Sequence, residues 1–180
     1  MVRASAFVGA VVAVASLGTA SPAELLSGRG VGELTPSFVV KDVTGPYKGK
    51  PICYVCEYQG APTVIGFFRD TGEATADLVV KLNDLAKRQV ALKVVVVLTA
   101  GTGQEAWLAQ LAEQNGITVP LTAFRRGPQD VAMKLYKLNP EASNTLLVST
   151  KRKVSANLVD VSADRFGQVE AAVQEMLALQ

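Results

Sequence analysis

Two continuous apolar runs constrain the fold of this 180-residue chain more than any other feature. Residues 63–68 (TVIGFF) and 93–98 (KVVVVL) have the composition of strands that are buried on both faces. Between them, residues 73–88 repeat leucine and valine at helical spacing, which predicts an amphipathic helix. A buried strand, a helix and a second buried strand in succession are typical of a parallel sheet that helices cover on both faces.

The remaining elements continue this alternation and then end in a hairpin. A strand precedes the first apolar run, and the second run is followed by a helix, a short strand, a short helix, two strands and a closing helix. The expected ranges are 37–43, 104–115, 119–124, 129–138, 145–148, 154–161 and 164–179. The basic turn Lys151-Arg152-Lys153 joins the last two strands, which predicts an antiparallel hairpin and makes the sheet mixed.

Composition excludes several classes of protein. The chain is 49% hydrophobic and 19% charged, which is typical of a globular domain. Its net charge of +2 gives no electrostatic argument for nucleic acid as a partner. The chain has no histidine, which excludes c-type haem attachment, zinc sites with imidazole ligands and catalytic triads built on imidazole.

The first 20 residues are typical of an export signal. Arg3 provides a short positive region, residues 4–18 are uncharged and mostly small or apolar, and small residues near 20–23 suit cleavage. The run is too short and too rich in alanine and glycine for a membrane span, so we expect none after signal removal. We expect an exported protein of the periplasm, cell envelope or medium, in which residues 21–36 form a leading arm and 37–180 one domain.

The order of elements resembles the thioredoxin-like superfamily. The resemblance covers residues 34–180 and is carried by the stretches 36–45 (PSFVVKDVTG), 63–68 and 145–159. The leading strand is similar to the N-terminal extension of the peroxiredoxin and TlpA/ResA-like branches. The resemblance implies an α/β three-layer sandwich with a mixed central sheet, a C-terminal antiparallel hairpin and an N-terminal strand extension.

The usual functional site of that superfamily lacks its chemistry in this chain. In thioredoxin-like oxidoreductases a CxxC follows the first central strand and opens the next helix, where this chain has Gly72 and Thr75. The same helix start lacks the peroxidatic cysteine of a peroxiredoxin, and Ser143-Asn144 stands where the family has a cis-proline. We therefore expect neither thioredoxin nor peroxidase activity at the usual site.

The two cysteines of the chain, Cys53 and Cys56, instead form a CxxC ahead of the first buried strand. Because the two ends of a six-residue strand are about 20 Å apart, we expect this pair at the end of the sheet opposite the usual site, unless residues 57–61 fold back. The function of the pair depends on its chemistry, for which the sequence leaves three interpretations.

The first interpretation is thiol–disulfide exchange or redox sensing with a protein partner, in which Cys53 is the nucleophile and Cys56 resolves the mixed disulfide. The second is a structural disulfide in a non-enzymatic binding or scaffold module. Export favours a disulfide, but a four-residue loop stabilises a fold by only about 2 kcal/mol. The third is a metal: two thiolates suit copper(I), or zinc shared across a dimer. We predict the first, with no cofactor and no metal.

The surroundings of the two sulfurs would distinguish exchange from a scaffold with a structural disulfide. Exposed sulfurs beside Lys48 or Lys50 would favour exchange, whereas a pair buried under Tyr47 or Tyr58 would favour a scaffold.

Residues 101–106 (GTGQEA) match the GxGxxA fingerprint of dinucleotide sites, but two arginines stand where an acid is expected about 20 residues on. We therefore interpret these glycines as parts of an ordinary turn.

Overall fold

The structure is a computed structural model that describes residues 25–179. The predicted signal segment, residues 1–20, and its cleavage region lie outside the described residues. The strands are β1 (Val40–Asp42), β2 (Pro51–Ile52), β3 (Thr63–Phe68), β4 (Lys93–Leu98), β5 (Leu121–Ala123), β6 (Asn144–Thr150) and β7 (Lys153–Val159). The helices are α1 (Tyr54–Glu57), α2 (Glu73–Arg88), α3 (Glu105–Asn115), α4 (Val131–Leu135) and α5 (Gly167–Ala178).

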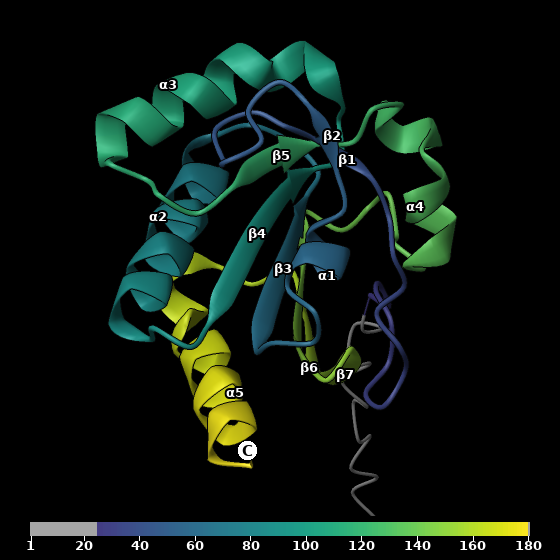
Figure 1. The fold of residues 1–180 in the computed structure, drawn as a ribbon, viewed down its shortest axis with the longest axis vertical. Helices are drawn as coiled ribbons and strands as arrows, with labels where there is room; N and C mark the ends of the chain where they lie inside the picture. The colour runs from purple at the N-terminus through teal and green to yellow at the C-terminus, as the bar shows by residue number, and fades with distance from the viewer. Residues whose placement is uncertain (1–24, 180) are drawn as a thin grey trace, which may run out of the picture.

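The strands form one mixed sheet in the order β2-β1-β5-β4-β3-β6-β7 (Figure 1). β3 is parallel to β4 and β4 to β5, whereas β6 and β7 are antiparallel and extend the sheet beyond β3. The leading strand β1 is antiparallel to β5, and β2 pairs with β1 at the far edge. The mixed sheet, the C-terminal hairpin and the N-terminal extension are therefore confirmed.

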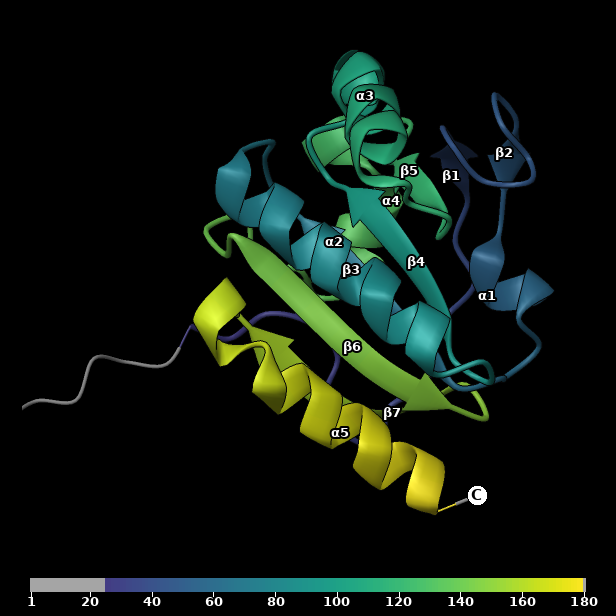
Figure 2. The same cartoon turned by 90° about the vertical axis from the view of Figure 1, so that its left-hand side faces the viewer.

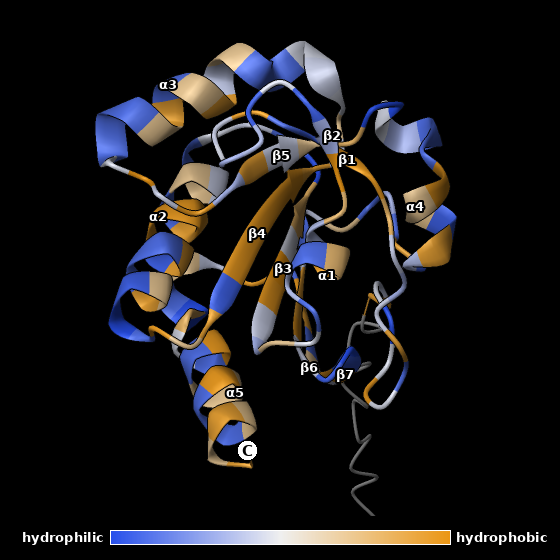
Figure 3. Cartoon of the chain, in the orientation of Figure 1, coloured by the Kyte–Doolittle hydropathy of each residue, from blue (hydrophilic) through white to orange (hydrophobic). Residues whose placement is uncertain are grey.

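Helices cover both faces of the sheet, which explains why the central strands are apolar throughout. Val64 and Phe68 of β3 pack with buried side chains of α2, α3 and α5, whereas Ile65 and Phe67 pack with those of α1 and α4. Figures 1 and 2 show α2 and α5 on one side of the sheet and α1 and α4 on the other. Figure 3 shows β3 and β4 as largely hydrophobic, between helices whose hydropathy alternates.

Three central elements have their predicted ranges, whereas others differ: β6 is longer than the expected 145–148, and β1, β5, α4 and α5 are shorter than expected. β3, α2 and β4 coincide with residues 63–68, 73–88 and 93–98. The helix expected over residues 129–138 is reduced to α4, because Lys137 has a φ of 56° that an α-helix does not accommodate.

The strand expected over residues 37–43 is reduced to β1, because the chain before it is bound to the hairpin turn. The N–H of Thr35 donates to the carbonyl of Arg152 at 2.9 Å. The guanidinium of Arg152 in turn donates to Ser37 Oγ at 3.0 Å. Lys151 and Arg152 both have a positive φ, of 50° and 59°, as the two central residues of a type I′ hairpin turn require.

The segment before β1 lies against the hairpin. Ser27 is buried, and its Oγ is 2.6 Å from Thr145 Oγ1 at the start of β6. Leu34 forms an antiparallel bridge with Lys153 at the start of β7. These contacts hold residues 25–36 against the domain.

Candidate functional site

The two cysteines lie at the two ends of one helical turn. Cys53 follows β2 in an extended conformation and is the N-cap residue of α1. One helical turn then brings Cys56 next to Cys53, because positions three apart share one face of a helix. The Cα atoms are 5.3 Å apart and the sulfurs form a disulfide. The N–H of Cys56 donates to Cys53 Sγ at 3.2 Å.

The two residues between the cysteines fix this turn to the core. Tyr54 and Val55 are 2% and 6% exposed and belong to the apolar cluster beneath α1 and α4. Cys53 is half-buried and packs against the same cluster, whereas Cys56 is exposed. The bulky middle residues therefore point inward and leave one sulfur-bearing residue at the surface.

A buried carboxylate anchors Tyr54. Asp42 is 0% exposed, and its Oδ2 accepts the hydroxyl of Tyr54 at 2.7 Å. The same carboxylate accepts the N–H groups of Gly45 and Tyr47, each also at 2.7 Å. Burial, and secondly the hydrogen bond to Asp42, raises the pKa of the Tyr54 hydroxyl, which keeps the phenol neutral and donating.

Sequence reasoning missed Asp42 as a site residue. Its signal is local: an aspartate followed three residues later by a glycine in DVTGP is typical of a side chain that hydrogen-bonds the backbone of a turn. A Cβ at Gly45 would lie 2.7 Å from Asp42 Oδ2, so the turn needs glycine at this position. The partner Tyr54 has no such local signal, because it is contributed by another element.

Two further tyrosines complete the support. The hydroxyl of Tyr58 donates to the carbonyl of Val94 in β4 at 3.0 Å, and burial raises its pKa. The hydroxyl of Tyr47 donates to Glu57 at 2.6 Å, and this hydrogen bond raises the pKa of Tyr47. The ring of Tyr54 lies between them, with centroids 6.2 Å from Tyr47 and 5.4 Å from Tyr58. The tyrosines therefore hold α1 in place without burying Cys56.

The two lysines that the sequence places near the cysteines form no hydrogen bond with the sulfurs in the described part of the chain. Lys48 and Lys50 are exposed in the turn between β1 and β2, where the N–H of Lys50 donates to the carbonyl of Tyr47. Within residues 25–179 neither ammonium group has a hydrogen bond or ion pair with a cysteine. The polar contact to Cys53 Sγ is instead a backbone N–H.

The disulfide lies over a face of the sheet rather than beyond its end. Figure 1 shows α1 in front of the sheet, beside β3. The hydroxyl of Tyr54 donates to Asp42 of β1, and that of Tyr58 to the carbonyl of Val94, the second residue of β4. The chain then enters β3 from the end opposite the usual site, where the carbonyl of Pro62 accepts the N–H of Lys93. The expected position of the pair at the opposite end of the sheet is therefore not seen. Pairing through β1, β5 and β4 sets Pro51 of β2 in the same row as Phe68 of β3, so β2 ends at the end of the sheet where β3 ends, and residues 57–61 fold back to reach the start of β3. The hydrogen bond from Tyr54 to Asp42 holds α1 over the face of the sheet.

The usual site of the superfamily holds no thiol in this structure. Gly72 is the N-cap residue of α2, and Thr75 is buried in its first turn. Beside it, the guanidinium of Arg69 forms an exposed ion pair with Asp70 at 3.2 Å. The N–H of Ser143 donates to Asp160 Oδ1 at 2.6 Å, at the position where a proline would have no donor.

The first glycine of the GxGxxA stretch has a packing role. Gly101 has a φ of 99°, and a Cβ there would lie 2.9 Å from the Cα of Gly127. The close approach of these two loops accounts for glycine at this position without a bound nucleotide.

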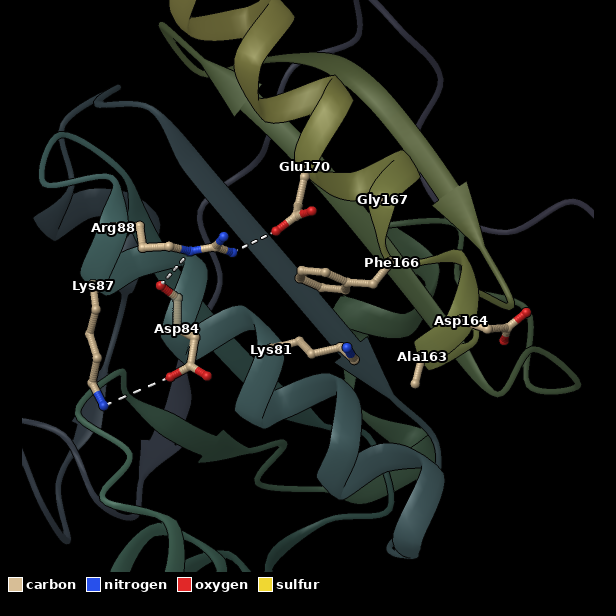
Figure 4. Close-up of a pocket in the computed structure, with 9 residues that line it drawn as sticks. All are labelled: Lys81, Asp84, Lys87, Arg88, Ala163, Asp164, Phe166, Gly167 and Glu170. Carbon is tan, nitrogen blue, oxygen red and sulfur yellow. Dashed lines mark hydrogen bonds and ion pairs between the residues drawn. The ribbon is translucent and has the colours of Figure 1, made fainter.

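A hollow lies on the other side of the sheet from the disulfide. It has a volume of about 710 Å³ between α2 and the start of α5 (Figure 4). Arg88 forms an ion pair with Glu170 across it, and Lys81 lies 5.9 Å from the ring centroid of Phe166. Its charged side chains are thus largely paired with one another, and none of them reaches the cysteines.

Neither a metal-binding group nor a helix that could span a membrane is found in the described part of the chain. In residues 25–179, no three side chains of histidine, cysteine, aspartate or glutamate gather into a metal-binding group. No helix within the same range is long and apolar enough to cross a membrane.

Comparison with known proteins shows the fold. No protein-family model and no curated protein matches the chain. Among solved structures, peroxidoxin BcpB from Mycobacterium tuberculosis is 23% identical with a TM-score of 0.64, over 83% of this chain and 97% of that one. A putative protein disulfide isomerase from Bacteroides thetaiotaomicron is 14% identical with a TM-score of 0.65, over 86% and 95%.

A third solved structure, a secreted disulfide oxidoreductase from Mycobacterium tuberculosis homologous to DsbE of E. coli, is 14% identical. Its TM-score is 0.58, over 77% of this chain and 95% of that one. The chain therefore has the thioredoxin-like α/β fold that the order of its elements predicts.

Proposed function

We propose that this chain is an exported thiol–disulfide exchange protein that works through Cys53 and Cys56 instead of the usual site of its fold. The observation that carries the proposal is the disulfide on α1, with Cys56 exposed and Cys53 Sγ accepting an N–H. A hydrogen bond to sulfur stabilises the thiolate over the thiol, and the thiolate is the reactive form.

The exchange needs no cofactor. In the reduced protein, the thiolate of Cys53 attacks one sulfur of a partner disulfide, and the other partner sulfur leaves as a thiolate that takes a proton from solvent. Cys56, once deprotonated, attacks the sulfur of Cys53 and releases the second partner thiol. The partner gains two electrons and two protons, and this protein ends as the Cys53–Cys56 disulfide. The reverse sequence oxidises a dithiol partner.

The packing of α1 favours exchange over a structural staple. Tyr54, Val55 and Tyr58 already hold this turn through burial and hydrogen bonds to β1 and β4. A disulfide across a four-residue loop adds only about 2 kcal/mol, so the bond is not needed to keep α1 in place. A pair of sulfurs that is dispensable for folding and open to solvent at one end suits a redox role.

Export is the part of the proposal that rests on sequence. Residues 1–20 have the pattern of a cleaved signal, and a disulfide persists in an oxidising compartment. The proposed partners are accordingly proteins with thiols or disulfides outside the cytoplasm. Fractionation of cells that express the full chain, with the N-terminus of the recovered protein sequenced, tests this part.

The reduction potential of the Cys53–Cys56 pair tests the exchange. The purified, metal-free protein is equilibrated in glutathione buffers and its free thiols are counted. We expect a potential between about −120 and −270 mV, which is the range of known exchange proteins. A value below about −300 mV would mark a structural bond and leave the binding or scaffold module as the better description.

A further inference from the structure

A groove of about 610 Å³ lies between the residues that lead into β1 and the loop that connects β5 to α4. Its walls carry aliphatic side chains and two consecutive arginines. Its lining includes Val39, Arg125, Arg126, Asp130 and Val131. Neither the disulfide nor the usual site of the fold contributes to it, so it is a separate surface.

The aliphatic side chains of this groove are unusually open to solvent. Val131, the first residue of α4, is 72% exposed, and Val39 is 47% exposed. Burial of such side chains by a partner is favourable at roughly 25 cal/mol for each Å² removed from water. They form an apolar stripe that a bound segment could cover.

The two arginines of the groove have no bonding partner for their guanidinium groups in the described residues. Arg125 and Arg126 are both exposed, and within residues 25–179 neither guanidinium has a hydrogen bond or ion pair. The acid beside them is already used, since Asp130 caps α4 by accepting the N–H of Ala132 at 3.1 Å and also accepts the N–H of Arg126 at 3.4 Å. Guanidinium groups suit carboxylates because they donate two parallel hydrogen bonds.

The groove adjoins the disulfide through β1. Val40 pairs with Ile52 and Lys41 with Pro51, so Val39 comes one residue before the first paired position of β1 and Cys53 one residue after the last paired position of β2. A segment that lies along Val39 therefore passes on the far side of β1 from the cysteine that we assign as nucleophile.

We propose that this groove binds an extended segment of the redox partner in which acidic and aliphatic residues alternate. The inference rests on the proposed exchange function for its choice of partner. The carboxylates would pair with Arg125 and Arg126, and the aliphatic side chains would cover Val39 and Val131. Opposite charges would also steer the encounter and increase its rate, more so at low ionic strength.

Exchange kinetics test the proposal with three disulfide peptides of equal length, in which Glu alternates with Val, Gln with Val, or Glu with Ser. We expect the Glu–Val peptide to react fastest with the reduced protein. Substitution of Arg125→Ala with Arg126→Ala should slow that reaction about tenfold at low salt and leave the Gln–Val peptide unchanged. Lys81→Ala with Lys87→Ala is the matched control, because it removes two charges from the hollow on the other side of the sheet.

Equal rates for the Glu–Val and Gln–Val peptides, or equal slowing by the two double variants, would overturn the proposal that the groove binds the partner. The exchange function would still stand. A Glu–Ser peptide as fast as the Glu–Val peptide would reduce the groove to a general anion site and would also overturn the proposal.

A binding measurement keeps the two proposals separable. Fluorescence anisotropy of a labelled, cysteine-free Glu–Val peptide with the Cys53→Ser, Cys56→Ser protein reports on the groove without any exchange. Binding that weakens with Arg125→Ala and Arg126→Ala supports the groove even if the protein exchanges with no disulfide, oxidised glutathione included. Absence of such binding overturns it.

Discussion

The disulfide turn, residues 53–56, precedes β3, and the start of α2 follows it. Each of these two regions is a place where the fold can hold a reactive pair of cysteines. The start of α2 offers the N-terminus of a 16-residue helix but has Gly72 and Thr75 in place of thiols. The disulfide turn has both thiols but only the four-residue helix α1. A helix of one turn has little macrodipole, so the thiolate depends on a single N–H.

The two regions also differ in how they are anchored. The disulfide turn is fixed by the side chains of Tyr54 and Tyr58, whereas the start of α2 is fixed by the helix that follows. A Cβ at Gly72 would meet nothing within 4 Å, so this position is open to substitution. The fold therefore retains a vacant place for a dithiol at the start of α2, whereas the chain carries its cysteines on another surface.

The largest effect is expected from removal of either cysteine. Cys53→Ser and Cys56→Ser should each abolish complete exchange, because release of the partner needs both thiols. Cys56→Ser should accumulate a mixed disulfide with a disulfide peptide, since Cys53 Sγ accepts the N–H that favours its thiolate. Mass spectrometry under non-reducing conditions measures the adduct. Accumulation with Cys53→Ser and none with Cys56→Ser would reverse the assigned roles.

The second prediction moves the pair to the vacant place. Gly72→Cys with Thr75→Cys, in a Cys53→Ala, Cys56→Ala background, should give a dithiol whose more acidic thiol has a pKa about one unit or more below that of Cys53. Gly72 has an extended φ of 173°, which any residue adopts, and cysteine is close in size to the buried Thr75.

The pH dependence of alkylation measures both pKa values, with Gly72→Cys alone as the control for the helix terminus without a second thiol. A pKa at the new site equal to or above that of Cys53 would show that the length of the helix does not decide thiolate stability in this fold.

The sequence predicts the start of α2 better than it predicts the disulfide turn. The ranges of β3, α2 and β4 follow from hydrophobic periodicity, which is strong in long elements, and the absence of thiols after β3 follows directly. The one-turn helix at Tyr54–Glu57 is too short to have a period. The bond between Tyr54 and Asp42 joins two elements across the sheet edge, and no local pattern records which elements meet. The groove beside β1 escapes prediction for the same reason.

The third prediction weakens the anchoring of the disulfide turn. Tyr54→Phe removes one of three donors from the buried Asp42 carboxylate, so it should lower the free energy of unfolding by about 1.5–3 kcal/mol. Tyr47→Phe is the matched control, because the hydroxyl that it removes bonds to the exposed Glu57 and should cost less than about 1 kcal/mol. Urea unfolding measures both, and equal losses would contradict the importance of the buried bond.

The smallest effect is expected from reduction of the disulfide itself. Because side chains of Tyr54, Val55 and Tyr58 hold α1 independently of the sulfurs, reduction should lower the free energy of unfolding by less than about 2 kcal/mol. Urea unfolding with and without reductant measures the difference, and the Cys53→Ser, Cys56→Ser protein controls for effects of the reductant. A small loss means that the folded protein accepts both redox states, as an exchange protein must. A loss of several kcal/mol would mean that the disulfide, and not the packing of Tyr54, Val55 and Tyr58, holds α1 in place. The Cys53–Cys56 bond would then be structural, and neither it nor the start of α2 would be a site of exchange.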